Sequence, residues 1–521
     1  MRRVLSLLLA AVLVAAWGSC AQAVDFAVKG QWLMGFGVGD GHLIAKKKER
    51  GGESVATNAD DKFNARQRVR VRLDAVASEN LSGTVHFEMG DSVWGKAGRR
   101  NGAALGADAT DVIELKHAFL DWTVPQTALK FRMGIQAVTL PNKAGGSPIM
   151  DDDVAGIVAS YKFNDNVALT ALWMRPINDN FNDKDKTTQT GYLDNTDILL
   201  VSLPLTFDGF EATPWFSWGM AGKHAIDSYN DNVGGTWYHW STMLPEQKND
   251  TTIAGRGDRG TSKAYGTIIW AGLPLAVTAL DPWNFELDLN YGYYEAMGRF
   301  DAIKHEGTPD ESVRRASSQR QGWLAKALIE YKLDWGIPGI FGWYASGDDG
   351  NVKNGSERMP ALSACGNFTS FMGDGPYAWS AGASTAFYDQ KLNYAGTWGI
   401  GARISDMKFL EDLKTTFTVA WWGGTNSPAM VKYMDHAYDW YEGSGPGDWC
   451  EGPYLTTNDG LLEFNLISTY KIYENLNLVL DLGYIANFMD NSTWSKTNSG
   501  KSTSFEKQDA WKAAFFLAYN F

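Results

Sequence analysis

The last fourteen residues, QDAWKAAFFLAYNF, constrain the fold more than any other stretch of the chain. Every second residue from Trp511 to Phe521 is apolar, and most of these are aromatic. The alternate positions, from Lys512 to Asn520, hold mainly small or polar residues. A period of two is typical of a β-strand. An aromatic-rich face backed by a wetter face is what a strand of a membrane-spanning barrel requires, and an edge strand of a soluble β protein is the alternative.

Residues 1–23 have the pattern of a secretory signal peptide. Two arginines precede an apolar run over residues 4–17, and an A-x-A cleavage sequence follows at 21–23. We therefore expect the mature chain to begin at Val24. The alternative, a helical membrane anchor, is disfavoured because the apolar run is short for a bilayer span.

The composition favours an exported all-β protein. The chain contains 22 Trp, 21 Tyr, 25 Phe and 55 Gly but only 16 Pro. Its formal charge of −13 becomes −15 when Arg2 and Arg3 are removed, which disfavours nucleic acid as a partner. A mature chain of this length would normally form several soluble domains, but the wall of a large barrel is one continuous sheet. We expect residues 24–521 to form one transmembrane β-barrel.

Strand-like segments alternate with short turns and long polar loops from Val24 onward. The expected strands are 25–34, 62–76, 80–90, 112–124, 128–137, 154–163, 167–176, 193–206, 210–219, 263–277, 283–297, 320–333, 338–346, 393–406, 413–424, 460–473, 476–489 and 506–521. Turns on one rim and long loops on the other are typical of an outer-membrane barrel. The count predicts eighteen antiparallel strands, with sixteen as the alternative, and barrels of this size enclose an aqueous channel.

The segment RQRVRVRLD, residues 66–74, places four arginines on one face of a strand. Arg66, Arg68, Arg70 and Arg72 share one parity, and apolar residues occupy the other. Each arginine would cost a few kcal/mol if it faced lipid at the middle of the bilayer. A dry core would also be unfavourable without partners. The pattern therefore predicts arginines that face a water-filled lumen, and Lys130 and Arg132 share the expected lumenal parity of a later strand.

The third long loop, AVTLPNKAGGSPIMDDD at 137–153, is the second candidate site. It carries two prolines, two glycines and the acidic run Asp151, Asp152 and Asp153.

These features give the chain a resemblance to the trimeric general porins of Gram-negative bacteria, and most of all to the homotrimeric porins of Desulfovibrio-type organisms. The residues that carry it are the signal peptide, the arginine row, the GIQ segment at 134–136 and Phe521. The resemblance implies a homotrimer in the outer membrane, in contact with lipid and lipopolysaccharide, and an assembly signal at Phe521. The chain lacks the PEFGG-like signature of enterobacterial third loops.

In such porins the third loop folds into the barrel and narrows the channel. The resemblance therefore implies that Asp151, Asp152 and Asp153 form the acidic side of a constriction. The basic side would comprise Arg66, Arg68, Arg70, Arg72, Lys130 and Arg132. Opposed charges across a narrow aqueous path orient and pass small polar solutes and ions. The expected function is passive diffusion of small hydrophilic solutes.

Three other functions stay open. A substrate-specific channel for a sugar, an amino acid or an organic acid would line its lumen with aromatic residues. A barrel enzyme would need a Ser–His or Asp–His constellation on one rim, and the sequence assembles none; the seven histidines are scattered. A structural surface protein is the third alternative. We expect no catalytic residues, no metal and no cofactor.

Smaller features remain. Cys365 and Cys450 are the only cysteines after residue 23, and they form either one disulfide or two free thiols. The GDDGN segment at 347–351 offers oxygen ligands but lacks the spacing of an EF-hand, so a solvated loop is favoured over a calcium site. Trp421 and Trp422 are expected in an aromatic girdle.

Overall fold

The computed structural model describes residues 24–41, 43–46, 63–97, 102–105, 113–178, 193, 195–222, 263–296, 299–305, 311–363, 368–373, 375–378, 394–434, 453–496 and 505–521. Its strands are β1 (Asp25–Asp40), β2 (Ile44–Lys46), β3 (Asn64–Ser78), β4 (Leu81–Trp94), β5 (Gly102–Ala103), β6 (Ile113–Thr123), β7 (Leu129–Thr139), β8 (Asp151–Lys162), β9 (Ala168–Asn178), β10 (Asn195–Ser202), β11 (Leu205–Phe207), β12 (Phe210–Ala212), β13 (Trp215–Gly222), β14 (Tyr265–Val277), β15 (Trp283–Tyr294), β16 (Arg299–His305), β17 (Glu311–Ser317), β18 (Arg320–Tyr331), β19 (Ile337–Ala345), β20 (Thr397–Leu410), β21 (Leu413–Gly424), β22 (Gly460–Tyr473), β23 (Leu476–Asn487), β24 (Phe505–Lys507) and β25 (Ala510–Asn520). Its short helices are η5 (Pro376–Ala378), η6 (Pro428–Tyr433) and α3 (Asn491–Trp494).

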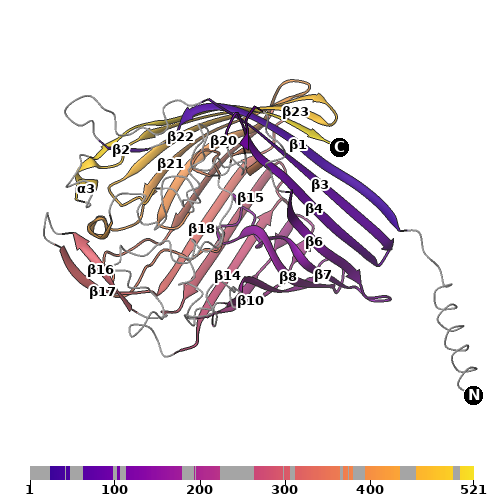
Figure 1. The fold of residues 1–521 in the computed structure, drawn as a ribbon, viewed down its shortest axis with the longest axis horizontal. Helices are drawn as coiled ribbons and strands as arrows, with labels where there is room; N and C mark the ends of the chain where they lie inside the picture. The colour runs from indigo at the N-terminus through magenta and orange to yellow at the C-terminus, as the bar shows by residue number, and fades with distance from the viewer. Residues whose placement is uncertain are drawn as a thin grey trace, which may run out of the picture.

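The wall is a closed antiparallel barrel (Figure 1). Strand β1 closes it, because Trp32 lies opposite Val69 of β3 and also opposite Tyr519 of β25. The sheet contains 21 strand segments. Of these, β5 is a two-residue segment beside β4, β11 continues β10, and β12 leads into β13, so the described residues form eighteen wall strands. The predicted count is confirmed, and the alternative of sixteen is not.

Two prolines divide the eighth and ninth wall strands. Pro204 lies between β10 and β11, and Pro214 lies between β12 and β13. A proline has no backbone N–H to donate, so it interrupts a strand ladder. The chain on either side still pairs as one hairpin, with Leu203 N donating to Pro214 O at 2.9 Å.

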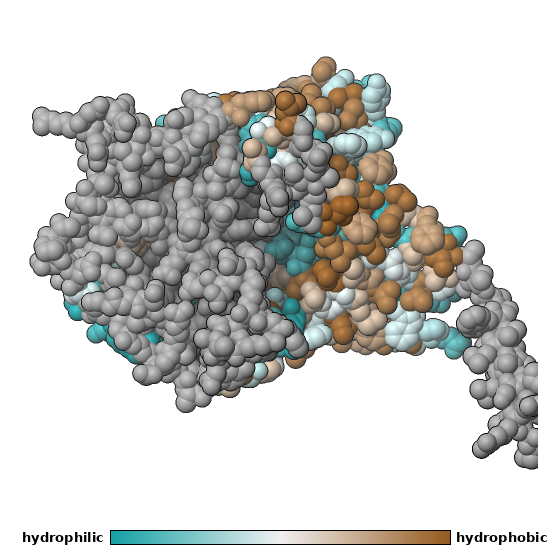
Figure 2. All heavy atoms as spheres, in the orientation of Figure 1, coloured by the Kyte–Doolittle hydropathy of each residue, from teal (hydrophilic) through white to brown (hydrophobic). Residues whose placement is uncertain are grey.

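The two faces of the wall differ in character because side chains alternate along each strand. Apolar side chains are exposed over the outer face of the wall, and they form the brown area of the barrel in Figure 2. Examples from different parts of the wall are Val28, Leu199, Phe216, Ile400 and Phe515. The alternate positions face the lumen. The predicted parity of the terminal strand β25 is confirmed, since Tyr519 lies opposite the outward-facing Trp32.

The first strand is longer than its predicted range of 25–34. The strand continues to Asp40, and Gly35, Gly37 and Gly39 occupy lumen-facing strand positions. Gly35 lies opposite Phe516, and Gly37 lies opposite Ala514. The lumenal face of β1 therefore leaves room for the side chains of β25.

Short turns join the strands on one rim, and long connections join them on the other. The turns include 79–80, 208–209 and 474–475, while the long connections include 346–396 and 425–459. One long connection contains the hairpin β16–β17, which was not among the strands expected from the sequence. Within the described residues, no helix has both the length and the apolar character needed to cross a membrane.

Candidate functional site: the lumenal wall and its two crossing loops

The arginine row of β3 faces the lumen. The intervening residues Val69 and Leu73 are on the outward parity, and Leu73 is exposed on the outer surface. Arg66 and Arg68 are covered, at 4% exposed each. The side chains of Arg70 and Arg72 keep 26% and 41% of their surface exposed. The two halves of the predicted row therefore differ, and only Arg70 and Arg72 present substantial surface to the lumen.

Both exposed arginines are paired with carboxylates of their own region of the wall. Arg70 Nε lies 2.6 Å from Glu88 Oε2 on β4. Arg72 Nε lies 2.8 Å from Asp74 Oδ1, and Thr84 Oγ1 donates to the same carboxylate at 2.6 Å. Such charge-assisted hydrogen bonds hold the guanidinium groups in fixed orientations.

A second basic group lies on β7, beside the first. Arg132 donates from Nε and Nη2 to the two carboxylate oxygens of Asp121, at 2.7 and 2.9 Å. Its guanidinium carbon lies 4.2 Å from the centre of the Phe119 ring, and that of Arg72 lies 5.9 Å from the same ring. Phe119 thus joins the two basic groups through cation–π contacts. Lys130 lines a cavity of about 390 Å³ on the same wall, together with Arg132 and Asp121.

The third loop, residues 140–150, crosses the lumen. The backbone N–H groups of Lys143 and Ala144 each donate to Asp288 of β15 at 2.9 Å. Lys326 of β18 donates to the carbonyl oxygens of Ala144 and Gly146, and its Nζ lies 3.1 Å from Asp288 Oδ2. Asp288 and Lys326 are almost fully buried. The loop that leaves β7 is therefore bound to the opposite part of the wall.

Paired glycines explain how the loop leaves the wall. Gly134 of β7 lies opposite Gly156 of β8. Beyond this pair, β7 and β8 stay together as far as Thr139 and Asp151. The ladder between β6 and β7 ends at Ile135, however, and the ladder between β8 and β9 ends at Gly156. Glycines inside strands mark such bends, and the hairpin end departs from both neighbours at this point.

Backbone geometry requires glycine at the first of these positions. Gly134 has a φ of +131°, and a Cβ there would lie 2.2 Å from the carbonyl oxygen of Ala118. Gln136, which is 2% exposed, donates from Nε2 to Gly156 O at 3.1 Å. The buried amide thus satisfies a backbone oxygen at the bend.

The acidic run does not lie on the third loop. The loop was expected over 137–153, but Asp151, Asp152 and Asp153 are the first residues of β8 because strand pairing extends to Thr139. Asp151 accepts a hydrogen bond from Thr139 Oγ1 at 2.5 Å, and Asp152 accepts one from Ser363 Oγ at 2.7 Å. The carboxylates that pair with the lumenal arginines come from β3, β4 and β6 instead.

Asp153 belongs to a polar row that the sequence did not reveal. Its carboxylate lies 2.6 Å from Lys116 Nζ and 2.7 Å from His117 Nε2. His117 Nδ1 lies 3.1 Å from His86 Nδ1. Two histidines that were scattered in the sequence are therefore adjacent, and they form an Asp–His–His row beside the arginines of β3. Lys116 is the extra residue of a β-bulge in β6, which no sequence pattern indicated.

Described residues of a second connection, 346–396, also enter the barrel. Phe371 N donates to Glu463 Oε1 of β22 at 2.8 Å. Lys512 of β25 donates to Ser370 O at 2.9 Å and lies 2.7 Å from Asp481 of β23. No sequence pattern indicated that this connection enters the barrel, because the parity of Glu463 and Lys512 identifies inward-facing charges but not the segment that they bind.

The second connection covers part of the arginine row and contacts the third loop. Tyr377, in η5, accepts a hydrogen bond at its carbonyl oxygen from Arg68 Nη2 at 3.1 Å. Leu362 N donates to Ile149 O at 2.8 Å, and Tyr394 OH donates to Gly145 O at 2.8 Å. The two loops thus narrow the lumen together.

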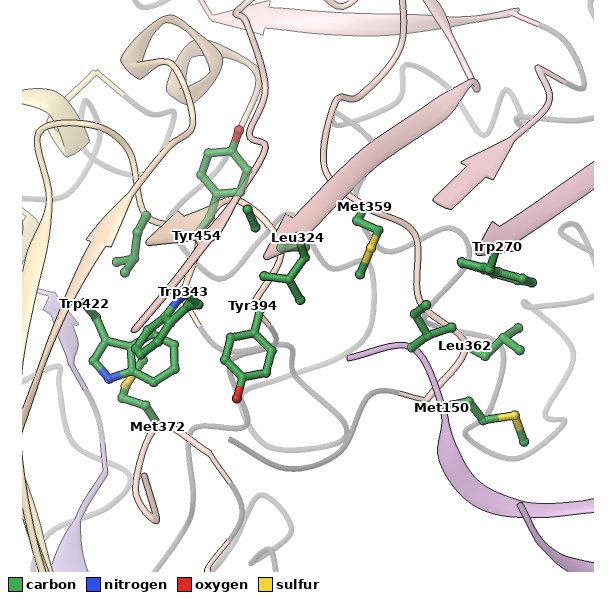
Figure 3. Close-up of a cluster of buried hydrophobic side chains, with 14 of the residues drawn as sticks. Met150, Trp270, Leu324, Trp343, Met359, Leu362, Met372, Tyr394, Trp422 and Tyr454 are labelled. Carbon is green, nitrogen blue, oxygen red and sulfur yellow. The ribbon is translucent and has the colours of Figure 1, made fainter. Parts of the chain in front are cut away.

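An aromatic and methionine cluster fills the space between the loops and the wall (Figure 3). Trp343 and Trp422 lie against each other with ring centres 4.3 Å apart, and Met150 lies near Leu362. Trp422 donates from Nε1 to Glu463 at 3.0 Å and is fully buried. The girdle expected for both members of the Trp421-Trp422 pair is therefore wrong for Trp422, because adjacent strand residues face opposite sides.

The GDDGN segment serves as a structural support of the second connection. Asp348 accepts hydrogen bonds from Tyr454 OH at 2.5 Å and from Ser356 Oγ at 2.6 Å. Asp349 N donates to the Glu357 carboxylate at 3.1 Å. Burial raises the pKa of Glu357 to about 7, and the nearby negative charges of Asp349 and Asp348 act in the same direction. Glu357 therefore titrates in the physiological range.

The predicted cysteine pair, Cys365 and Cys450, and the predicted signal peptide, residues 1–23, lie outside the described residues. Phe521 completes the β1–β25 pairing: Gly30 N donates to Phe521 O at 2.8 Å, and Phe521 N donates to Gly30 O at 3.0 Å. A Cβ at Gly30 would lie 2.3 Å from the Phe521 ring, so this glycine makes room for the aromatic side chain.

No protein-family model matches the chain. No curated protein matches it either. Similar solved structures include Pseudomonas aeruginosa OpdL, at 11% identity and a TM-score of 0.46 over 95% of this chain and 99% of that one. Others are Pseudomonas aeruginosa OpdO, at 12% identity and 0.46 over 95% and 97% of the two chains, and OccK11 (OpdR), at 9% and 0.46 over 95% and 96%. With TM-scores below 0.5, the functional conclusion rests on the chain's own geometry.

Proposed function

We propose that the protein is an outer-membrane channel for passive diffusion of small hydrophilic solutes and ions. The observation that carries this proposal is the charged lumenal wall formed by Arg70, Arg72 and Arg132 with their carboxylate partners, next to two loops that narrow the barrel. Fixed charges of both signs along a narrow aqueous path favour hydrated polar solutes and hinder apolar ones.

The outer face supports a membrane location. Apolar and aromatic side chains are exposed around the wall, and a soluble protein would bury a surface of this kind. The proposal includes outer-membrane lipid and lipopolysaccharide as surroundings, Phe521 as an assembly signal and a homotrimer as the assembly. The trimer and the assembly signal rest on the sequence resemblance.

The test is the single-channel conductance of the purified protein in planar lipid bilayers, combined with swelling of liposomes in sugars of increasing size. A diffusion channel gives stable conductance steps and swelling that falls steadily with solute size. A trimer gives steps in groups of three. Absence of conductance in correctly folded protein contradicts the proposal.

The second candidate is a substrate-specific channel. The observation in its favour is the cavity of about 390 Å³ where Lys130, Arg132 and Asp121 meet the third loop, a volume within the usual range of small-molecule sites. Block of the ionic current by one solute at a low concentration, with no block by others of the same size, supports this candidate over a general channel. Neither candidate gives a residue a catalytic role.

A further inference from the structure

The barrel wall is interrupted beside the third loop. β8 pairs with β9 from Lys162 as far as Gly156, which lies opposite Met174. Beyond that point, residues 151–155 of β8 pair with β7, whereas Ile177 of β9 pairs with Thr196 of β10. Pro176 lies in this part of β9 and has no N–H to offer to a ladder. The two strands therefore diverge towards the loop side.

A cavity of about 330 Å³ occupies this divergence. We call it the β8–β9 gap, and its lining residues include Ile135, Asp153, Val154, Arg175, Ile177 and Leu362. Most of these residues are apolar. The volume lies at the lower end of the range for small-molecule sites.

The lining residues come from both faces of the wall. Ile135 and Arg175 are on the outward parity and are exposed. Ile177 and Leu362, at 2% and 5% exposed, lie on the inner side, where Leu362 belongs to the second crossing connection. The gap therefore extends from the outer surface of the barrel to the loops inside it.

The charged groups around the gap are paired. Arg175 donates to the two carboxylate oxygens of Asp197 at 2.8 and 3.0 Å. Asp153 is paired with Lys116, and Asp152 accepts from Ser363. Among the described residues that line the gap, a ligand with a net charge would find no uncompensated opposite charge, whereas one neutral hydrogen-bonding group could reach a carboxylate oxygen or the guanidinium group. Apolar walls with a polar margin suit an amphipathic molecule.

We infer that the β8–β9 gap is a lateral binding site for a small neutral amphipathic molecule with an alkyl or aryl body and one hydrogen-bonding head group. The apolar body lies against Val154, Ile177 and Leu362. The head group lies at the margin formed by Asp153 and Arg175. Such a ligand reaches the interior of the barrel from the membrane side, without passing the charged lumenal wall.

The test uses a photoreactive alkyl-diazirine analogue of 1-octanol with the full chain in lipid nanodiscs, and the labelled residues are mapped by mass spectrometry. Leu362 is the informative position, because it is buried inside the barrel and does not face lipid. We expect labelling of Leu362 that saturates with probe concentration and is blocked by excess 1-octanol. Labelling of outward-facing residues rises linearly instead.

A matched pair of substitutions makes the test specific. Ala155→Trp places an indole in the gap, and Ala159→Trp places one on the same outward face of β8, outside the gap. We expect Ala155→Trp to reduce Leu362 labelling by about tenfold or more, and Ala159→Trp to leave it unchanged. Both variants should keep the wild-type conductance, so this result is independent of channel function.

Equal labelling of Leu362 in the two variants would overturn the inference. So would labelling that does not saturate. If a phospholipid carrying a diazirine at the end of its acyl chain labels Leu362 and excess 1-octanol does not compete, the occupant is a membrane lipid and the proposal of a free solute fails.

Discussion

Lys326 is buried on β18 and binds the third loop on the side of the barrel opposite β7. It binds two loop carbonyl groups and lies against Asp288, which also accepts two loop N–H groups. Removing one partner of a buried ion pair typically costs about 3–5 kcal/mol, because the other charge is left uncompensated. The attachment of the loop therefore depends on a pair whose members lie on β15 and β18, far from the loop in sequence.

We expect Lys326→Met to lower the free energy of unfolding by roughly 3–5 kcal/mol and to make residues 140–150 accessible to protease. Thermal unfolding followed by gel mobility and limited proteolysis measure the two effects. Lys332→Met, which changes an exposed turn lysine, is the control and should behave as wild type. Unchanged protease resistance of Lys326→Met would show that other contacts hold the loop.

The bend in β7 depends on glycine at position 134. Gly134→Ala should destabilise the barrel by about 1–3 kcal/mol, because its φ is unfavourable for a side chain and the new Cβ meets a backbone oxygen. Gly83→Ala is the control, since the nearest atom to its Cβ is the end of the flexible Leu120 side chain at 3.3 Å. The folded fraction in a urea titration measures both, and equal midpoints would contradict the expectation.

At the scale of elements, the two crossing connections behave as one packed unit. The third loop and residues 346–363 share backbone hydrogen bonds at Ile149, and both pack into the cluster around Trp343. Each has its own buried anchors on the wall, Asp288 with Lys326 and Glu463 with Lys512. Loosening one connection should therefore loosen contacts of the other.

The carboxyl group of Glu357 makes the second connection sensitive to pH. Its pKa is raised to about 7, above that of an unfolded glutamate near 4.5. Between these values the folded state holds a proton that the unfolded state has released, so stability falls as pH rises from about 4.5 to about 7 and then levels off. The unfavourable ionised form is fully present above that window.

We expect proteolysis within 346–363 to be faster at pH 8 than at pH 5.5 after correction for the pH dependence of the protease. Glu357→Gln should remove most of the difference, because the amide remains neutral at both values. Glu474→Gln, on an exposed turn, is the matched control. If Glu357→Gln keeps the full pH dependence, another group is responsible.

At the scale of the whole molecule, the lumenal arginines should set the ion preference of the channel. Replacing Arg70 and Arg72 by Gln removes the arginines that pair with Glu88 and Asp74, so the lumen becomes more acidic. We expect the reversal potential in a salt gradient to move towards cation selectivity by several millivolts or more, as the charge of the pore wall controls local ion concentration. Arg175→Gln is the control.

Arg175 is informative as a control because it lies on the outward face and is also paired with a carboxylate. Its loss changes the net charge of the protein without changing the lumen. A reversal potential that responds equally to Arg175→Gln and to the lumenal substitutions would mean that the ions do not pass the wall of β3.

The strands of the barrel wall could be predicted from local sequence patterns. Alternation along RQRVRVRLD and along the terminal strand depends only on neighbouring residues, since successive side chains of a strand point to opposite faces. The strand count, the parity of Arg70, Arg72, Lys130 and Arg132, and the sorting of turns and loops were predictable for this reason. The predicted first strand ended too early, at residue 34, because the glycines that follow weaken the alternating strand pattern.

Local sequence patterns were therefore sufficient to predict the barrel and the character of its two faces. How the lumen is filled became visible only in the folded chain: where the third loop crosses, that a second connection enters, that Asp153 meets His117, and that the wall opens beside β8. These features depend on contacts between residues far apart in the chain, such as Lys326 with Ala144 or Glu463 with Phe371. A periodic pattern shows which way a side chain points, but not which distant segment will reach it.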